Sequence, residues 1–557
     1  MKKNSFVEGT IIATIAIVFT KILGMLYVIP FYAIIGSLGS ALYSYAYNIY
    51  VTFLNISSAG IPVAISKLVS EYDTLGKKEA KVRSLKLGIT IISIISVICF
   101  LILFLFAEQV ATIIIGDLSG GNTISDIALV LRVVAFAVLI IPFLSVSKGY
   151  LQGHKYIGPT SISQMIEQVV RIIVILAGSY ITICLLKKEV KIGVAVAISG
   201  AFIGGLFAIL YIFKKIHDHK HELDLDVLQK KDDITNKEIL KKILSYAIPF
   251  IIINVTVNFF NLVDMTLIIR TMDKLGFSAH DAEFISSAMT TWGYKLNMIV
   301  NAIATGLTVS LIPNIVRANT ANKPKQVASI LNRALQIVLI ISMPAAIGLS
   351  FLAKPVWTLF YGPSILGPIM FKVSILTSIM CNVYLIGIQT AQSLNEYKTV
   401  YKAVIFGFSM NAIFDVPFMY ICSYLNLPAF YGATFATMLG YIVAISIVLR
   451  KLRLRKEVTY QKTLKVFLKI VISILAMLAV LSIIRLIFPF NSTSKLFATI
   501  YISIFAVIGA SIYFTCIWRF GLIGKVFGPK MVNKLLNKMT FGIIKIKGDL
   551  NDLQEDE

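Results

Sequence analysis

The chain has 557 residues, of which 57% are hydrophobic and only 14% are charged, and its mean hydropathy is +0.84. A soluble protein of this length would carry far more charge, so the composition excludes the soluble globular classes and predicts a membrane protein. The net charge of +24 comes from 52 basic and 28 acidic residues. In a soluble protein this excess would favour nucleic-acid binding, but here the basic residues gather in loops and indicate topology instead.

Long apolar runs recur along the whole chain. Each has about 20 residues or more, which is enough for a helix to cross the hydrocarbon core of a bilayer. The N-terminal stretch MKKNSFVEG enters the first run without a small-residue cleavage site, so we expect a retained helix and not a removed signal peptide. The predicted fold is an all-α polytopic membrane protein with about 14 transmembrane helices, at residues 10–35, 41–66, 87–107, 126–147, 161–184, 191–213, 243–269, 284–313, 333–353, 371–394, 402–425, 430–449, 466–488 and 496–518.

The charges of the loops orient these predicted helices. Residues 67–86 hold six Lys and Arg, 214–242 hold eight and 450–465 hold seven, whereas 108–125 and 426–429 hold none. Loops rich in Lys and Arg face the cytoplasm. We therefore expect both termini on the cytoplasmic side, which agrees with an even number of spans.

The sequence repeats itself at a nearly constant shift. Moving the segment 48–117 by 246 positions places Asn55 on Asn301 and Gly60 on Gly306, with a matching hydropathy pattern. Such a shift predicts two similar bundles of six helices. Because six is even, both bundles begin on the same side of the membrane, which makes them parallel repeats.

The repeat divides the chain into five predicted regions. Two facing bundles can rock about a central cavity and open it to either side in turn, so the architecture favours a transporter over a duplicated scaffold or channel. The predicted regions are an N-terminal six-helix bundle at 1–213, a cytoplasmic linker at 214–242, a C-terminal six-helix bundle at 243–449, additional helices 13 and 14 at 450–518, and a cytoplasmic tail at 519–557.

Two lysines lie inside predicted helices without an acidic residue one turn away. Lys21 belongs to the first predicted helix and Lys295 to the eighth. An unpaired ammonium group in lipid has to deprotonate or reach water, so these lysines predict a hydrated cavity, and two of them in one cavity would bind an anion. The alternative is that each lysine is buried and paired with a distant acid such as Asp264.

Carboxylates inside the predicted helices leave two questions open. Glu167 and Arg171 are spaced i, i+4, which fits either a self-neutralised pair or a role in the cavity. Asn411 and Asp415 share a helix face in the same way, and together with Asp264 they offer the oxygen ligands that suit a hard cation. Hydrogen bonds within the second bundle would explain these residues equally well.

The sequence contains no Walker loop, dinucleotide fingerprint or HExxH pattern. We therefore expect a transporter and not an enzyme, driven by an ion gradient or by the membrane potential.

The five cysteines lie in apolar runs without metal or disulfide spacing. The HDHKH stretch at 217–221 favours an ordinary polar linker over a metal site.

Four stretches of the chain are similar to one known family. They are TKILGMLYVIPFYAIIG (20–36), SAGIPVAISKLVSEY (58–72), KGYLQGHKYIGPTSISQMIEQVVRI (148–172) and YKLNMIVNAIATGLTVSLIPNI (294–315). These stretches resemble the lipid II flippase family of the MurJ, YtgP and SpoVB type, in the multidrug/oligosaccharidyl-lipid/polysaccharide exporter superfamily. The resemblance covers nearly the whole chain, including the two predicted helices outside the repeat.

The resemblance implies a flippase that moves lipid II, an undecaprenyl-diphosphate-linked peptidoglycan precursor, from the inner to the outer leaflet of a bacterial cell membrane. The implied partners are this lipid-linked oligosaccharide, membrane lipids and the cell-wall synthesis machinery, without nucleic acid. Another polyprenyl-linked polysaccharide precursor is an alternative substrate. A cation-coupled multidrug antiporter and a scaffold without transport activity are more distant alternatives.

The resemblance also assigns roles to residues. Lys21 and Lys295 match family arginines of a cationic cavity, and Asn55 stands in the region of a further one, while Tyr27 and Val28 replace an Arg-Asp pair of many members. The expected substrate-binding residues, none of them catalytic, are Lys21, Asn55, Glu167, Arg171 and Lys295. Sodium is the only cofactor implied, and the matching residues for its site are Asp264, Asn411, Asp415 and Thr437.

Overall fold

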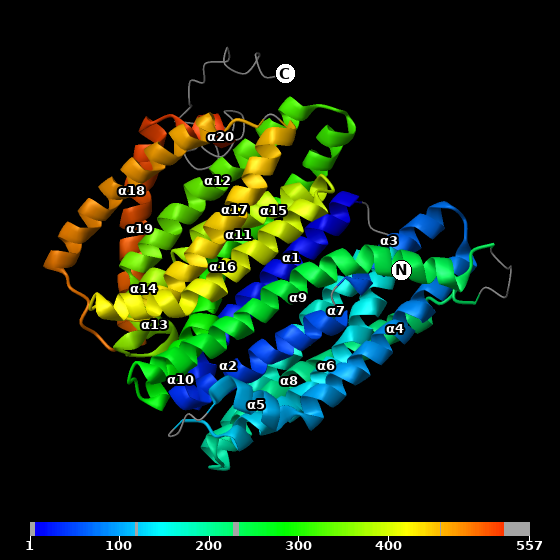
Figure 1. Ribbon diagram of the computed structural model, residues 1–557, viewed down its shortest axis with the longest axis horizontal. Coiled ribbons are helices and arrows are strands. Elements are labelled where there is room, and N and C mark those ends of the chain that lie inside the picture. Colours follow the sequence, from blue (N-terminus) through cyan, green and yellow to red (C-terminus); the bar gives the residue numbers. More distant parts are fainter. Residues whose placement is uncertain (1–5, 59, 117–120, 227–232, 457, 528–557) are drawn as a thin grey trace. The chain divides into compact units, whose positions relative to one another are not determined.

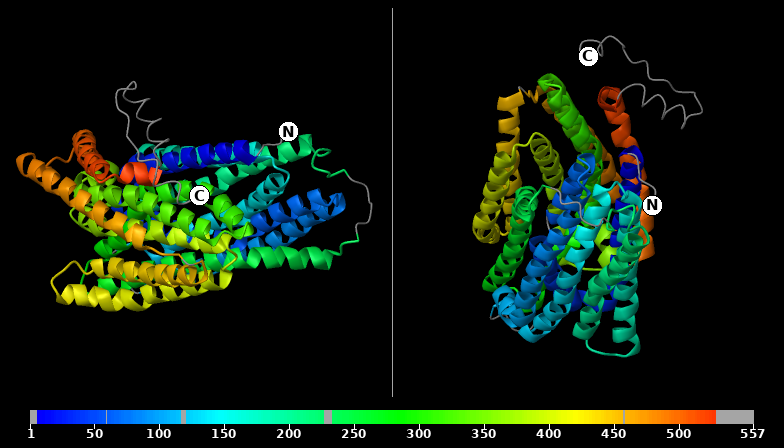
Figure 2. Two further views of the ribbon diagram at one scale, coloured as in Figure 1. Left: turned by 90° about the horizontal axis from the view of Figure 1, so that it is seen from above. Right: turned by 90° about the vertical axis from the view of Figure 1, so that its right-hand side faces the viewer.

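The computed structural model describes residues 6–58, 60–116, 121–226, 233–456 and 458–527. All regular secondary structure in these ranges is helical, which confirms the predicted all-α class (Figures 1 and 2). Twelve described helices are long and apolar enough to cross a membrane, and Ile15–Leu26 forms a shorter apolar helix. The chain is therefore a multi-pass membrane protein. Of the fourteen predicted spans, those at 10–35 and 284–313, which carry Lys21 and Lys295, have no counterpart of their own among the twelve.

The helices follow one another in the order of the chain. Their bounds are α1 (Phe6–Leu26), α2 (Val28–Ser58), α3 (Ile61–Thr74), α4 (Lys78–Leu105), α5 (Ala107–Ile115), α6 (Ile124–Gly153), α7 (Ile157–Ile173), η1 (Val174–Gly178), η2 (Ile181–Leu185), α8 (Val190–Asp218), α9 (Asn236–Lys274), α10 (Ala279–Ser287), η3 (Ala288–Trp292), α11 (Gly293–Thr320), α12 (Pro324–Phe351), α13 (Ala353–Tyr361), α14 (Leu366–Ser374), α15 (Thr377–Ser393), α16 (Tyr397–Tyr424), α17 (Tyr431–Lys456), α18 (Gln461–Ile487), α19 (Lys495–Arg519) and α20 (Leu522–Phe527), where η marks π-helical turns.

The boundary between the first two predicted spans lies inside α2. Gly36 has φ 67° and ψ −171°, a conformation that glycine adopts without a steric penalty. The chain turns there, so the predicted span 10–35 corresponds to α1 and the first part of α2.

Farther along, Thr123 and Asp126 form a capping box at the start of α6, and Thr235 forms one with Glu238 at the start of α9. These side chains satisfy backbone N–H groups that would otherwise lack partners, which explains why both helices begin where they do.

The chain forms two compact units. Unit 1 comprises residues 1–296 and 404–440, and unit 2 comprises 297–403 and 441–557. In unit 2, the two helices predicted to lie outside the repeat, α18 and α19, pack on each other and on α12. The hydroxyl of Tyr513 on α19 donates to the carbonyl of Ile340 on α12 (2.8 Å). The division into bundles 1–213 and 243–449 stays a prediction, and residues 528–557 of the predicted tail lie outside the described ranges.

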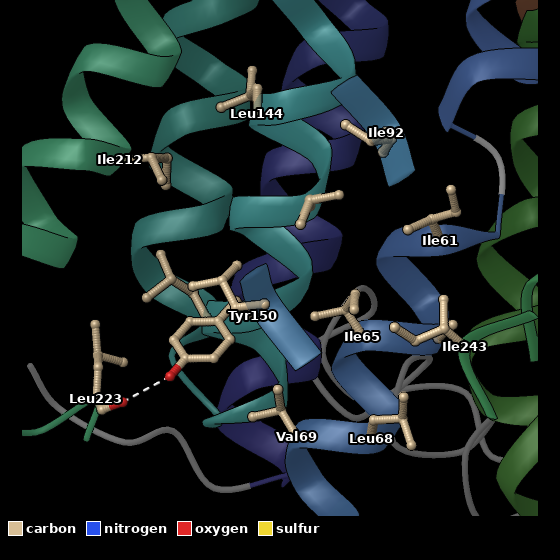
Figure 3. Close-up of a cluster of buried hydrophobic side chains, with 14 of the residues drawn as sticks. Ile61, Ile65, Leu68, Val69, Ile92, Leu144, Tyr150, Ile212, Leu223 and Ile243 are labelled. Atoms are coloured by element: carbon tan, nitrogen blue, oxygen red, sulfur yellow. Dashed lines mark hydrogen bonds between the residues drawn. The ribbon is translucent and has the colours of Figure 1, made fainter. Parts of the chain in front are cut away.

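A buried apolar cluster in unit 1 includes part of the predicted linker. Leu223 is fully buried among side chains of five helices, and the hydroxyl of Tyr150 donates to its backbone carbonyl (2.7 Å), as Figure 3 shows. The labelled members of the cluster are Ile61, Ile65, Leu68 and Val69 of α3, Ile92 of α4, Leu144 and Tyr150 of α6, Ile212 of α8, Leu223, and Ile243 of α9. The beginning of the linker is thus part of the packed core of unit 1.

An ion cluster beside Leu223 fixes the same segment. Lys81, whose side chain is only 2% exposed, donates to Asp73 (2.6 Å) and to Asp224 (2.5 Å), and Lys78 pairs with Asp224 as well (2.9 Å). Burial opposes ionisation of Asp224, but the hydrogen bonds from Lys81 and Lys78 outweigh it, so the pKa of this carboxyl lies below its ordinary value. The ionised carboxylate therefore stabilises the docked linker.

The shifted pKa of Asp224 gives the stability of the protein a defined pH dependence. A carboxyl whose pKa is lower in the folded state stabilises the protein above its unfolded pKa, about 3.9, and this contribution is lost as pH falls through the folded pKa. We expect the melting temperature in detergent micelles to fall more steeply below about pH 4 for the wild type than for Asp224→Asn. The exposed Asp218→Asn should follow the wild-type curve. Parallel curves for the wild type and Asp224→Asn would contradict this role.

Candidate functional site

The ammonium group of Lys295 lies among four aromatic rings in unit 1. Nζ donates a hydrogen bond to the hydroxyl of Tyr27 (2.9 Å). It lies 4.5 Å from the ring centroid of Trp292, 4.9 Å from Tyr27, 5.2 Å from Tyr43 and 5.7 Å from Tyr47. We call these four residues the aromatic box. In the described part of the chain Lys295 has no ion pair with a carboxylate, so the alternative of a distant acid such as Asp264 finds no support.

Local helix geometry brings the rings of the aromatic box together. Tyr43 and Tyr47 lie one turn apart on α2, so they share a face, and their rings stack at 6.0 Å with an angle of 14°. Tyr27 occupies the break between α1 and α2, and its hydroxyl lies 3.3 Å from that of Tyr43. Trp292 ends η3 directly before α11, three positions ahead of Lys295, and its indole N–H donates to the carbonyl of Ser40 (3.2 Å).

Glu167 pairs with Arg171 and with a third residue, Lys148. Arg171 Nη2 lies 2.8 Å from Glu167 Oε1 on α7, and Lys148 Nζ of α6 lies 3.1 Å from Oε2. The i, i+4 pair is therefore real, but it is not self-neutralised, because two cations share one carboxylate. The cluster retains one positive charge.

A small pocket connects this ion cluster with the aromatic box. Tyr43 and Tyr47 belong to the box, and the same two residues line a pocket together with Arg171. The remaining lining residues come from α2, α6, η1 and α8: Tyr50, Val134, Ile175, Ala197, Ile198 and Ala201. Lys295 and Arg171 thus both neighbour Tyr43 and Tyr47. With Lys148 and Glu167 they make three cations and one carboxylate, which leaves two positive charges.

Two predicted cavity residues are not joined to this group by any hydrogen bond or ion pair. Lys21 is half-buried on α1, and its ammonium group has no such partner within the described ranges. The amide of Asn55 donates to the carbonyl of Val51 in its own helix (2.7 Å). The structure therefore brings together Lys295, Arg171 and Glu167, while the roles of Lys21 and Asn55 stay predictions.

The predicted sodium-site residues Asp264, Asn411 and Asp415 do come together. Asn411 on α16 donates its amide N–H to Asp264 on α9 (2.6 Å). Asp415 lies one turn farther along α16 and is fully buried. Both of its carboxylate oxygens, and the amide oxygen of Asn411, lack a hydrogen-bond donor among the described residues. Buried oxygens without donors are costly, and two carboxylates with an amide oxygen form a ligand set that suits a hard cation.

Thr437 is the fourth residue of the predicted sodium site. Its hydroxyl donates to the carbonyl of Ala433 in α17 (3.0 Å), and no hydrogen bond joins it to Asp264, Asn411 or Asp415 in the described chain. Gly440, one turn farther along α17, packs so closely on α16 that an added Cβ would lie 3.2 Å from Cβ of Asn411. The described residues include no cluster of three His, Cys, Asp or Glu that could hold a metal. Any cation here would therefore depend on amide, hydroxyl or carbonyl oxygens beside the two carboxylates.

Sequence reasoning missed Lys148 and the aromatic box. Lys148 lies at the start of the stretch that resembles the family, but 19 positions separate it from Glu167, which exceeds helical spacing. Tyr43, Tyr47 and Tyr50 at i, i+4 and i+7 are a helical stripe of tyrosines, and this was the available signal. A stripe of this kind is found on ordinary packing faces as well, so the stripe alone does not indicate a functional site. The position of Lys295 beside these rings does.

The fold and the charged groups within its helices define a multi-pass helical membrane protein with ionised side chains inside its spans. The chain belongs to the family described as polysaccharide biosynthesis protein, whose match covers residues 6–319. It is 30% identical to lipid II flippase MurJ of Bacillus subtilis (strain 168) over 449 residues, which are 79% of this chain and 81% of that protein. The uncharacterized membrane protein YabM of the same organism is 29% identical over 362 residues, or 64% of each chain.

A solved structure shares the fold. Lipid II flippase MurJ in an inward closed conformation matches 92% of this chain and 98% of its own, with a TM-score of 0.67 and 19% identity. The comparisons confirm the resemblance to the lipid II flippase family. The similarity to lipid II flippase MurJ of Bacillus subtilis, which extends over most of both chains, also confirms that the chain is a transporter and not an enzyme.

Proposed function

We propose that this chain is a flippase that translocates lipid II from the inner to the outer leaflet of a bacterial cell membrane by alternating access. The observation that carries the proposal is the pair of uncancelled cations at the tyrosine group of unit 1, in a chain 30% identical to a lipid II flippase. A diphosphate is the anionic part of such a lipid. Two positive charges that lie away from bulk water complement the negative charge of the diphosphate.

The cations of the site divide the recognition of the diphosphate between them. Lys295 offers a point charge that can approach one phosphate, and the guanidinium of Arg171 can form two parallel hydrogen bonds. Glu167, whose carboxylate also pairs with Lys148, holds Arg171 in place. Lys21 and Asn55 complete the cavity in this proposal. The prenyl tail stays in the lipid while the headgroup crosses, so the cavity needs to accept only the polar part.

The same proposal covers coupling and topology. The bundles 1–213 and 243–449 open the cavity to each side in turn, and both termini face the cytoplasm. Sodium would bind at Asp264, Asn411 and Asp415, with Thr437 as the remaining ligand, and would supply the charge that the orphaned oxygens require. The lipid substrate and the surrounding membrane lipids are the partners, together with the machinery of cell-wall synthesis.

A second candidate substrate is another polyprenyl-linked polysaccharide precursor. The family description, polysaccharide biosynthesis protein, favours this broader class. Both candidates share the diphosphate and the prenyl chain, so the cations of unit 1 serve either of them. A multidrug antiporter would carry cations, which two uncancelled positive charges repel.

Depletion of the protein in intact cells tests the substrate. We expect the amount of lipid II on the outer leaflet to fall as the protein is depleted, in a strain without a second flippase. Restoring the wild-type gene should restore the outward-facing lipid. Unchanged exposure of lipid II, with loss of another surface glycan, would instead assign the second candidate substrate.

A further inference from the structure

The aromatic box holds a charged group without cancelling its charge. All four ring centroids lie within the roughly 6 Å over which the face of an aromatic ring attracts a cation. Among the described residues, the hydrogen-bond partner of the ammonium is the neutral hydroxyl of Tyr27. A carboxylate in this place would bind Lys295 more tightly, but it would also neutralise it. The residues that hold Lys295 therefore do not cancel its positive charge.

The rings are fixed by contacts of their own. Trp292 is only 1% exposed, and its indole N–H is held by the carbonyl of Ser40. Tyr43 packs edge-on against Phe31 (5.0 Å, 72°) and stacks on Tyr47. Side chains that are locked in this way do not have to rearrange around the ammonium group. The rings of the aromatic box are thus held in place by contacts that do not involve Lys295, and they in turn fix the position of its ammonium group.

We propose that the aromatic box is a charge-neutral holder that positions the Lys295 ammonium for one phosphate-type group of the substrate. The proposal rests on the proposed function and names the residues that prepare its anion site. A charge-assisted contact with a phosphate is stronger than the attraction of the rings, so the substrate does not have to displace a competing carboxylate. Trp292, Tyr27, Tyr43 and Tyr47 are positioning residues, because they act through Lys295.

The experiment measures binding of undecaprenyl diphosphate and of uncharged undecaprenol to the purified full-length protein in nanodiscs. Trp292→Leu removes one aromatic face, and we expect it to weaken diphosphate binding about tenfold while undecaprenol binding stays unchanged. Trp292→Phe retains an aromatic face and should stay within about threefold of the wild type. Tyr47→Leu and Tyr47→Phe repeat the comparison at a side chain that is less buried.

The Lys295→Met background shows whether the rings act through the lysine. There we expect Trp292→Leu and Tyr47→Leu to have no further effect on diphosphate binding, because the charge that the rings position is gone. The same loss in both backgrounds, or leucine variants that bind like the wild type, would overturn the proposal. If depletion leaves lipid II exposure unchanged but ring-dependent diphosphate binding persists, the aromatic box stands and the assigned lipid is wrong.

Discussion

Replacing Lys295 by alanine is expected to abolish the ability of the protein to sustain growth, while the variant still accumulates in the membrane. The lysine is one of two uncancelled cations at the tyrosine group, and within the described ranges its ammonium makes a single hydrogen bond, to Tyr27. Loss of one partner of a desolvated charge contact costs about 2–5 kcal/mol, or about 30- to 4,000-fold in binding. The measurement is growth of a strain that depends on the variant, together with the amount of variant protein in the membrane.

A matched control separates this effect from the removal of any lysine from a membrane helix. Lys469 on α18 donates to the carbonyl of Phe520 and has no part in the site. Lys469→Ala should support normal growth. If a strain relying on Lys295→Ala grew as well as one relying on Lys469→Ala, the cationic site would lose its basis.

The positions of the helices were predictable from the sequence because the bilayer imposes a length and a composition on each span. The turn between the first two spans was predictable too, since it falls at Gly36, between the predicted spans 10–35 and 41–66. The packing of the linker against the core of unit 1 could not be predicted from the sequence. Leu223 and Asp224 lie in a stretch of polar residues, and nothing in that stretch shows that a leucine enters the core of unit 1.

The site was predictable to the extent that its residues are close in sequence or match the family. Glu167 and Arg171 follow from helical spacing, whereas the third partner, Lys148, comes from another helix. The contact between Lys295 and Tyr27 joins residues 268 positions apart. Contacts of this range depend on how helices pack, which the spacing of residues within one helix does not determine. For this reason the lysine could be singled out from the sequence, but the aromatic box around it could not.

Replacing Asp415 by asparagine is expected to remove the response of the protein to sodium. The carboxyl group is fully buried, and no side chain or backbone group of the described residues donates a hydrogen bond to its oxygens, so its ionised form is costly unless a cation neutralises it. Without sodium, Asp415→Asn should therefore melt at a higher temperature than the wild type. With increasing sodium at constant ionic strength, the wild type should gain stability by mass action, and the variant should gain little. The melting temperature of the purified protein in sodium and in choline chloride measures both effects.

The contact between Asn411 and Asp264 predicts that Asp415→Asn also removes the response of transport to sodium. Asn411 holds Asp264 at 2.6 Å, so the two carboxylates on α9 and α16 form one ligand set. We expect the sodium concentration needed for half-maximal transport to rise at least about tenfold in Asp415→Asn, because the charge of the ligands sets cation affinity. Asp273→Asn, at an exposed carboxylate of α9, should leave the response unchanged. A wild-type sodium response in Asp415→Asn, in stability and in transport, would exclude these residues as the coupling site, and the membrane potential would then have to drive the cycle alone.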